Sequence, residues 1–496
     1  MPVNPKMPAM IETTKKISAH FRSVTVHSSS LRTAGASSRA THLTSGDGTG
    51  SWPSTPPVPV ELSAICPQQA TIHPLPNSVP GGNIAGKQLA GARRDMTTIS
   101  QTSAPAGVRA VPKTKARNAA IDRARTFITM LVLVHHSVIA YTYYGHTDRQ
   151  SFLGFDLVVL FNDSFFMSAM FFLSGLFVWP SLQRKGIAWF LRDRWWRLGL
   201  PFIVCALLVM PFAYWAVELE LHDPNMTFAA FWWRTVTVGP WNSGPAWFVW
   251  VLLALDVIAA FVYYALSGWI ETIGKLSLES FGRPGLFFWA LLIATTVVYV
   301  PSVLYFGASR WFALGPVAIQ ASRILLYLLY FFFGCGIGAA SFDRGLLAPD
   351  GEMARRWPVW LGATIFTYGC IVALIYIKHS VLPDPNNLPF WWNLAYALAF
   401  VSYSAAQTFN ILALFLRFDN EGSSIFDPLR DSAYGIYLLH YVPVLWLQYW
   451  LFGMTFGPVD QLTAIIKAII VFVLTLASSW AATVALRKIP GATRVL

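Results

Sequence analysis

A series of long apolar segments after residue 120 constrains this chain more than any other feature of its sequence. A helix that spans a bilayer needs about 20 predominantly apolar residues. Inside the bilayer every backbone polar group must be hydrogen bonded within the protein, which favours helices for such segments. The sequence therefore predicts an all-α polytopic membrane protein, a bundle of about ten transmembrane helices. The predicted helices cover residues 124–144, 157–179, 198–217, 246–267, 285–306, 322–341, 358–377, 391–416, 433–453 and 462–486.

Composition agrees with a membrane protein and argues against nucleic-acid binding. Hydrophobic residues make up 55% of the chain and charged residues 12%, whereas soluble domains average about 25% charged residues. The net charge of +12 comes from basic residues scattered over the N-terminal region and short loops, without the basic stripe of a nucleic-acid interface. We therefore expect membrane lipids around the protein and no nucleic-acid partner.

The distribution of basic residues predicts the orientation of the bundle. If the segment before the first helix is cytoplasmic, ten crossings place 20 Lys and Arg residues on the cytoplasmic side and six on the other, as the positive-inside rule requires. The sequence thus predicts an integral membrane protein with both termini in the cytoplasm. We expect the bacterial inner (plasma) membrane as its location. The six residues on the other side are Arg149, Arg234, Arg310, Arg323, Lys378 and Lys467.

The N-terminal 118 residues differ from the rest of the chain. They are rich in Ser, Thr, Pro, Ala and Gly and lack a sustained apolar period, so we expect a disordered extension before a transmembrane domain at 119–490. A basic, Ser-rich leader with few acidic residues is similar to an organelle transit peptide. A simpler hypothesis is a wrongly assigned start codon, with Met96 as the true start. Native peptides from before Met96 would refute it.

The first predicted helix contains ionisable residues, which are costly inside a membrane and so indicate function. Arg125 precedes His136 by eleven residues, which is three helical turns within about 20°, so the two side chains share a face. At 1.5 Å per residue they lie about 16 Å apart, roughly half of a hydrocarbon core of about 30 Å. Arg125 is therefore predicted at the cytoplasmic interface and His136 near the midplane.

The histidines of this helix are candidates for a general base. A buried imidazole tends to stay neutral and can then accept a proton. The alternative is a histidine that only hydrogen bonds one helix to another. Because adjacent residues point about 100° apart on a helix, His135 and His136 cannot both face the same site. The spacing from Arg125 favours His136, and His135 stays an alternative.

Basic residues also follow the second predicted helix. Arg194 and Arg197 are spaced i to i+3 and would project from one face of a helix end. Guanidinium groups bind phosphates in a bidentate manner, so the pair is a candidate phosphate site. The alternative is that both residues serve only as signals for membrane topology.

Five further residues are candidates for lining a cavity or an acceptor site. Structural explanations compete: a solvated helix end for Asp163, close helix packing beside Gly175 for Ser174, membrane-interface anchoring for Trp247, and a structural role for His440, which shares a helix face with Tyr437. No spacing of His, Cys, Asp or Glu is typical of a metal site, so no metal is predicted. The five are Asp163, Ser174, Trp247, Tyr437 and His440.

Five short motifs occur in order along the chain: Arg125-x10-His136, FFMSAMFFLSG at 165–175, Arg194-x-x-Arg197 followed by a proline, GPAWF at 244–248 and YGIYLLH at 434–440. Together they resemble the acyltransferase-3 family of membrane O-acyltransferases over roughly residues 120–488. The loop arginines and the last motif are most similar to the glucan biosynthesis protein C branch.

The resemblance implies a reaction and a role for each candidate. An acetyl or succinyl group would move from cytoplasmic acyl-CoA, a co-substrate rather than a bound cofactor, to a hydroxyl of an extracytoplasmic glycan or lipid-linked sugar of the cell envelope. By this resemblance His136 is the essential histidine, Arg125 its partner, and Arg194 and Arg197 contact the donor.

Two other classes of protein compete with this interpretation. A transporter or flippase would use His136 as a proton relay, but transporters often contain repeated halves, and no internal repeat is evident in the sequence. A structural or sensing membrane protein would leave the placement of Arg125 and His136 unexplained.

Overall fold

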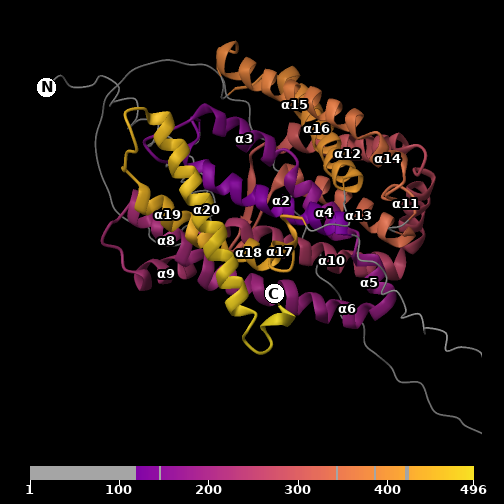
Figure 1. Ribbon diagram of the computed structural model, residues 1–496, viewed down its shortest axis with the longest axis horizontal. Helices are drawn as coiled ribbons and strands as arrows, with labels where there is room; N and C mark the ends of the chain where they lie inside the picture. Colours follow the sequence, from indigo (N-terminus) through magenta and orange to yellow (C-terminus); the bar gives the residue numbers. More distant parts are fainter. Residues whose placement is uncertain (1–118, 145–146, 342–343, 385–386, 419–423, 496) are drawn as a thin grey trace, which may run out of the picture. The chain divides into compact units, whose positions relative to one another are not determined.

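The computed structural model describes residues 119–495 apart from 145–146, 342–343, 385–386 and 419–423 (Figure 1). These residues belong to one compact unit, Lys115–Leu496. The predicted N-terminal extension at 1–118 and the proposed start at Met96 lie outside the described residues.

Nine helical segments of the described residues are long and apolar enough to cross a membrane, as expected for an all-α polytopic protein. Some contain several helices that follow one another directly. The segments are Ala119–Tyr141 (α2, Ala119–Val138), Leu153–Lys185 (α3, Leu153–Asp163; α4, Phe166–Gly175; α5, Val178–Lys185), Ile187–Leu221 (α6, Ile187–Arg194; α7, Leu200–Val204; α8, Met210–Leu221), Gly244–Ala265 (α10, Trp247–Ala265), Pro284–Phe306 (α12), Ala321–Ala340 (α13, Ile324–Ala340), Trp357–Ser380 (α15), Phe390–Arg417 (α16) and Asp460–Leu486 (α20).

The ninth predicted crossing, 433–453, is present as two shorter helices, α18 (Ala433–Leu439) and α19 (Tyr441–Leu451), which meet at His440. Contacts at both ends of α2 indicate that this pair runs the same distance as a spanning helix. Asp427, just before α18, binds Arg123 in the first turns of α2. Lys467, near the start of α20, binds Asp148 in the loop that follows α2. The chain between Asp427 and Lys467 therefore passes from one end of α2 to the other.

The central helix α2 differs from its prediction at both ends. It lies in the middle of the bundle, in contact with α3, α4, α16, α18 and α20 (Figure 1). It begins five residues before the predicted helix at 124–144, and it ends at Val138 followed by a single 3₁₀ turn, Ile139–Tyr141. His136 consequently lies in the last turn of α2 rather than halfway along it. A loop continues the chain beyond it, and the side chains of Asp148 and Gln150 in this loop are buried.

The third spanning segment is longer than predicted and contains two π-helical turns. It was expected at 198–217 after a loop, but the chain is helical from Ile187, directly after a turn at Gly186 with φ of 73°. The π-helical turns, Trp195–Gly199 and Cys205–Val209, precede Pro201 and Pro211 respectively. Hydropathy alone did not predict this start, because the basic residues of α6 lower the apolar score of a segment that is nevertheless helical.

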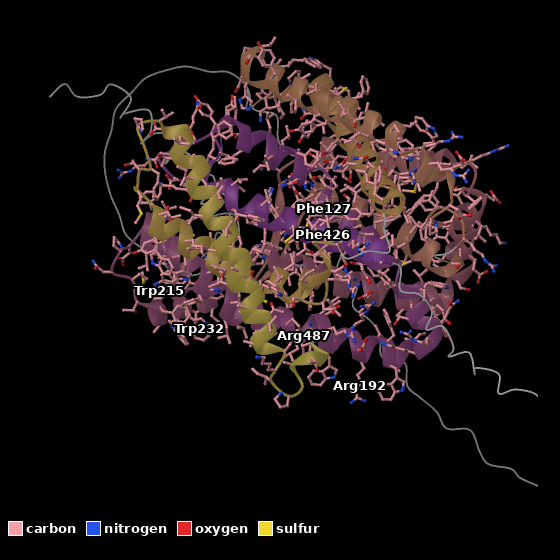
Figure 2. The ribbon with its side chains drawn as sticks, viewed as in Figure 1. Phe127, Arg192, Trp215, Trp232, Phe426 and Arg487 are labelled. Carbon is pink, nitrogen blue, oxygen red and sulfur yellow. The ribbon has the colours of Figure 1, made fainter. Side chains whose placement is uncertain are left out.

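Each proline of this segment releases a backbone carbonyl four residues earlier, because its ring has no N–H and clashes there. The two carbonyls accept hydrogen bonds from neighbouring helices instead. Tyr434 Oη donates to the carbonyl of Arg197 over 2.5 Å, and Trp232 Nε1 donates to that of Leu207 over 2.7 Å. Trp232 lies on a short helix, α9 (Phe228–Thr237), at the edge of the bundle (Figure 2). The neighbouring helices thus compensate for both prolines, as membrane bundles permit.

Several elements were not predicted. The described residues contain one antiparallel hairpin, β1 (Trp311–Leu314) with β2 (Val317–Gln320). Short helices lie between the spanning segments: α9, α11 (Ser267–Glu279), α14 (Glu352–Arg355) and α17 (Asp427–Arg430). Their four to thirteen residues are too few for a hydropathy search that looks for about 20 apolar residues.

Glycines bring α4 and α13 into direct backbone contact. A Cβ atom on Gly175 would overlap the carbonyl oxygen of Phe331, and one on Gly334 would overlap that of Phe172. Small residues allow membrane helices to approach in this way, and van der Waals contact then holds them together. The expectation that Gly175 serves close packing is confirmed.

Replacing Gly334 by alanine should therefore destabilise the bundle. We expect a loss of about 1–3 kcal/mol, typical of overpacking, because the obstacle is backbone that cannot rotate away. Gly362→Ala on α15 is the matched control, since no atom lies within 4 Å of a Cβ built there. It should be neutral or slightly stabilising. Thermal unfolding of both variants in detergent measures the difference, and equal midpoints would contradict the packing account.

Candidate active site

The two histidines of α2 lie in different surroundings. The His135 side chain is buried, and its ring packs against Phe166 with centroids 5.2 Å apart. His136 is only partly buried, and its Nδ1 lies 3.0 Å from the carbonyl oxygen of Val132. His136 is therefore the more accessible of the two imidazoles.

A third histidine contacts His136 from a distant part of the chain. His440 Nε2 lies 3.3 Å from His136 Nδ1, although 304 residues separate them in sequence. The other ring nitrogen, His440 Nδ1, lies 2.7 Å from the carbonyl oxygen of Tyr437. His440 is fully buried at the junction of α18 and α19. The sequence placed it among cavity-lining candidates but did not predict its contact with His136.

Two residues of α19 complete the surroundings of His136. Gln448 Nε2 donates to the backbone carbonyl of His136 over 3.0 Å. The ring of Tyr441 lies perpendicular to the His136 ring with centroids 5.1 Å apart, and its hydroxyl is 3.3 Å from that of Tyr214. Both contacts attach the last turn of α2 to α19, so the position of His136 depends on the α18–α19 junction.

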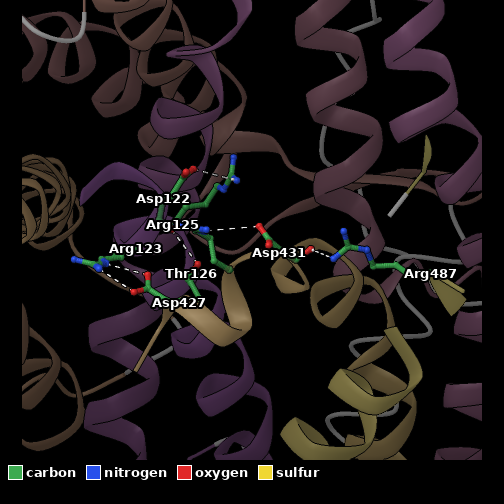
Figure 3. Close-up of polar contacts among 8 residues, drawn as sticks. Asp122, Arg123, Arg125, Thr126, Asp427, Asp431 and Arg487 are labelled. Atoms are coloured by element: carbon green, nitrogen blue, oxygen red, sulfur yellow. Dashed lines mark hydrogen bonds and ion pairs between the residues drawn. The ribbon is translucent and has the colours of Figure 1, made fainter. Parts of the chain in front are cut away.

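Arg125 lies at the opposite end of α2, in a region rich in ion pairs (Figure 3). Its guanidinium is 3.6 Å from Asp122 and 5.8 Å from the centre of the Phe177 ring, and 35% of its side chain is exposed. No break interrupts α2 between Arg125 and His136, so the predicted separation of about 16 Å along the axis holds.

Other ion pairs at this end join separate helices. Arg123 donates two hydrogen bonds to Asp427, of 3.0 and 2.8 Å, and these bonds lower the pKa of Asp427 to about 2. Arg487, at the end of α20, donates to the backbone carbonyl of Asp431 over 2.8 Å. Arg123 thus connects the start of α2 to α17, and Arg487 connects the end of α20 to the residue that follows α17 (Figure 3).

Arg194 and Arg197 have different partners. Arg194 Nε lies 3.2 Å from the carboxylate of Asp256, which is fully buried on α10, and 19% of the Arg194 side chain is exposed. Arg197 pairs with Asp193 at 3.4 Å and is 54% exposed. The π-helical turn that begins at Trp195 changes the angular step between them, because a π-helix has more residues per turn than an α-helix. Of the two, Arg197 offers the more accessible guanidinium.

Asp256 is a residue that the sequence analysis missed. It is a carboxylate in the middle of an apolar span, and ionisable residues in such positions indicate function by default. That signal was visible in the sequence. Its partner Arg194 was not, because α6 and α10 are separated by more than fifty residues.

Asp163 and Ser174 make contacts that the sequence did not predict. Asp163 forms a bidentate pair with Arg323, of 3.0 and 2.6 Å, at a break between α3 and α4. Asp163 is the last residue of α3 and its side chain is 45% exposed, so it lies at a partly exposed helix end and is in addition paired with Arg323. Ser174 Oγ donates to the carbonyl of Met170 in its own helix over 2.7 Å.

Three of the sequence motifs contact one another. Phe171 of the second helix packs on Phe248 with centroids 4.7 Å apart, and Phe248 packs on Tyr437 at 5.6 Å. The Tyr437 hydroxyl also donates to the carbonyl of Pro245 over 2.6 Å. Trp247 stacks on Tyr327 with centroids 5.7 Å apart. The second-helix motif, GPAWF and YGIYLLH therefore form one packed region, and YGIYLLH contains His440.

No cluster of three or more His, Cys, Asp or Glu side chains suited to a metal ion occurs among the described residues.

Comparison with known proteins identifies the family. A family model described as an acyltransferase domain matches residues 118–484, well over half of the chain. A search of curated proteins finds no match. The extent of the family match, together with the apolar spanning helices, shows that this chain belongs to the acyltransferase-3 family and is a membrane acyltransferase.

Proposed function

We propose that this acyltransferase moves an acetyl or succinyl group from cytoplasmic acyl-CoA to a hydroxyl of an extracytoplasmic glycan, with His136 as the general base. The observation that carries the proposal is the placement of His136, a partly accessible imidazole inside the bundle about 16 Å from Arg125 on one unbroken helix. His135 is the weaker candidate because its ring is buried against Phe166.

In the proposed reaction His136 takes a proton from the acceptor hydroxyl and later gives it to the leaving thiolate. His136 accepts the proton of the acceptor hydroxyl while the oxygen attacks the thioester carbonyl. A C–O bond forms, the C–S bond breaks, and the departing thiolate takes the proton from His136. CoA-SH and the acyl ester are the products, and the imidazole is neutral again.

The donor would bind at the Arg125 end of the bundle. The phosphates of CoA are anionic, and arginines form strong charge-assisted hydrogen bonds with phosphate oxygens. Arg125 and Arg197 are both partly exposed. Arg194, three residues before Arg197, is paired with Asp256. The flexible arm of CoA would extend from there toward His136.

Arg197→Ala should weaken donor binding without unfolding the protein. We expect KM for acyl-CoA to rise about 10- to 100-fold, since a hydrogen bond to a charged group contributes about 1.5–3 kcal/mol. Arg192→Ala is the matched control: it removes a basic residue of the same helix that is exposed at the edge of the bundle (Figure 2). Steady-state kinetics with varied acyl-CoA measure both. An equal rise in KM for acyl-CoA in the two variants would indicate only a nonspecific attraction between acyl-CoA and basic side chains.

The proposal of a glycan acceptor outside the cytoplasm is based on the predicted topology and on the resemblance to glucan biosynthesis protein C. Lys467 near the start of α20 pairs with Asp148 in the loop after α2, and both positions are predicted on the same side, which supports the proposed order of crossings. The orientation with both termini cytoplasmic rests on the distribution of basic residues. A glycan of the cell envelope is then the acceptor, and the bacterial inner membrane the location.

The function is tested with purified protein in liposomes, ¹⁴C-labelled acetyl-CoA or succinyl-CoA, and a linear glucan oligosaccharide as acceptor. We expect label on the glucan in an ester that mild alkali releases. Uptake of the glucan without labelling would contradict the proposal and support a transporter.

A further inference from the structure

His136 and His440 form an imidazole pair whose hydrogen-bonding roles can be deduced. The carbonyl oxygen of Tyr437 can only accept, so His440 Nδ1, at 2.7 Å, carries a proton. In the neutral ring the other nitrogen, His440 Nε2, then has a lone pair. This lone pair faces His136 Nδ1 at 3.3 Å.

The same reasoning defines the tautomer of His136. Its Nδ1 lies 3.0 Å from the carbonyl oxygen of Val132, a second group that can only accept. If Nδ1 were unprotonated, its lone pair would face two other lone pairs. With a proton on Nδ1, both neighbours are satisfied. The lone pair of neutral His136 is therefore on Nε2, for which the described residues provide no hydrogen-bond partner.

We infer that His440 is a positioning residue that holds His136 in the Nδ1–H tautomer and leaves Nε2 as its basic atom. This inference rests on the proposed role of His136 as the base. His440 would act as the orienting third group does in other nucleophile–base arrangements, with a neutral ring in place of a carboxylate. When Nε2 takes a proton, the Nδ1–H bonds to Val132 and His440 become charge-assisted and stronger.

The position of His440 suits this role. It is fully buried, and the Tyr437 carbonyl accepts a hydrogen bond from His440 Nδ1–H. Tyr437 is itself anchored, because its hydroxyl donates to the carbonyl of Pro245. Gln448, about two helical turns after His440, donates to the backbone carbonyl of His136. The ring of His440 is thereby fixed with respect to α2 by contacts on both sides of the α18–α19 junction.

Two substitutions separate positioning from packing. His440→Gln keeps an acceptor oxygen that can replace Nε2, whereas His440→Phe keeps a ring but no acceptor. We expect His440→Phe to lower kcat about 10- to 100-fold with little change in KM for acyl-CoA, and His440→Gln to retain activity within about 3-fold. If His440 only packed against its neighbours, the His440→Phe variant, which keeps a ring, would be more active than His440→Gln. Higher activity in His440→Phe than in His440→Gln would overturn the inference.

A second readout does not depend on acyl transfer. ¹⁵N NMR of histidine-labelled protein, with the His136 signals identified by their loss in His136→Ala, reports which ring nitrogen is protonated. We expect protonated Nδ1 and unprotonated Nε2 for His136, and a mixture of tautomers in His440→Phe. A wild-type His136 protonated on Nε2 would overturn the inference. The expected tautomer in a protein that shows no acyl transfer would refute the proposed function and leave the positioning role standing.

Discussion

His136→Ala should lower the rate of acyl transfer about 10²- to 10⁴-fold, the usual contribution of a general base. Expression and folding should be unchanged, since His136 is only partly buried and its side chain bonds to one carbonyl and to His440. The rate is measured with labelled acyl-CoA and the glucan acceptor, on protein that elutes as one species in size-exclusion chromatography.

The adjacent histidine is the matched control. His135→Ala removes the same side chain one residue away, but from a buried site against Phe166. We expect it to keep activity within about 10-fold of the wild type, less than the usual loss of a general base. Near-complete loss in His135→Ala with an active His136→Ala would transfer the role of the base to His135.

Lys467→Met should be the most destabilising of the substitutions considered. Lys467 Nζ lies 2.9 and 3.0 Å from the two carboxylate oxygens of Asp148 and 2.8 Å from Gln150, and its side chain is fully buried. Removing one partner of a buried pair leaves the other charge without compensation, which costs about 3–5 kcal/mol. We therefore expect a lower midpoint of thermal unfolding in detergent.

A double substitution tests the cause of that loss. Asp148→Asn removes the remaining buried charge and keeps an oxygen that can accept from the backbone N–H of Gln150, as Asp148 does at 3.1 Å. Adding Asp148→Asn to Lys467→Met should therefore recover much of the lost stability. If the double variant is as unstable as the sum of the two single variants, the buried charge is not the cause.

Much of the fold could be predicted because hydrophobic length is a strong signal in a membrane protein. The exceptions have physical reasons. The start of α2 was predicted five residues too late, because a hydropathy count scores Asp122 and Arg123 in its first turns as unfavourable. In the structure both residues form ion pairs. The ninth predicted span, 433–453, is divided at His440, and hydropathy does not report a junction between two helices in one apolar segment.

The candidate site was predictable only where its residues share one helix. The spacing of Arg125 and His136 follows from helical geometry, and the structure retains it. The contact of His136 with His440 joins positions 304 residues apart, so no local pattern contains it. The same applies to Arg194 with Asp256 and to Lys467 with Asp148, whose partners lie on different helices or loops.

The central claim is that donor and acceptor approach His136 from opposite sides of the membrane. Inverted membrane vesicles test it, with labelled acyl-CoA added outside, at the cytoplasmic face, and the glucan oligosaccharide enclosed in the lumen. We predict label on the enclosed glucan in wild-type vesicles and none in vesicles with His136→Ala. Label found only on glucan added to the same side as acyl-CoA would contradict the claim.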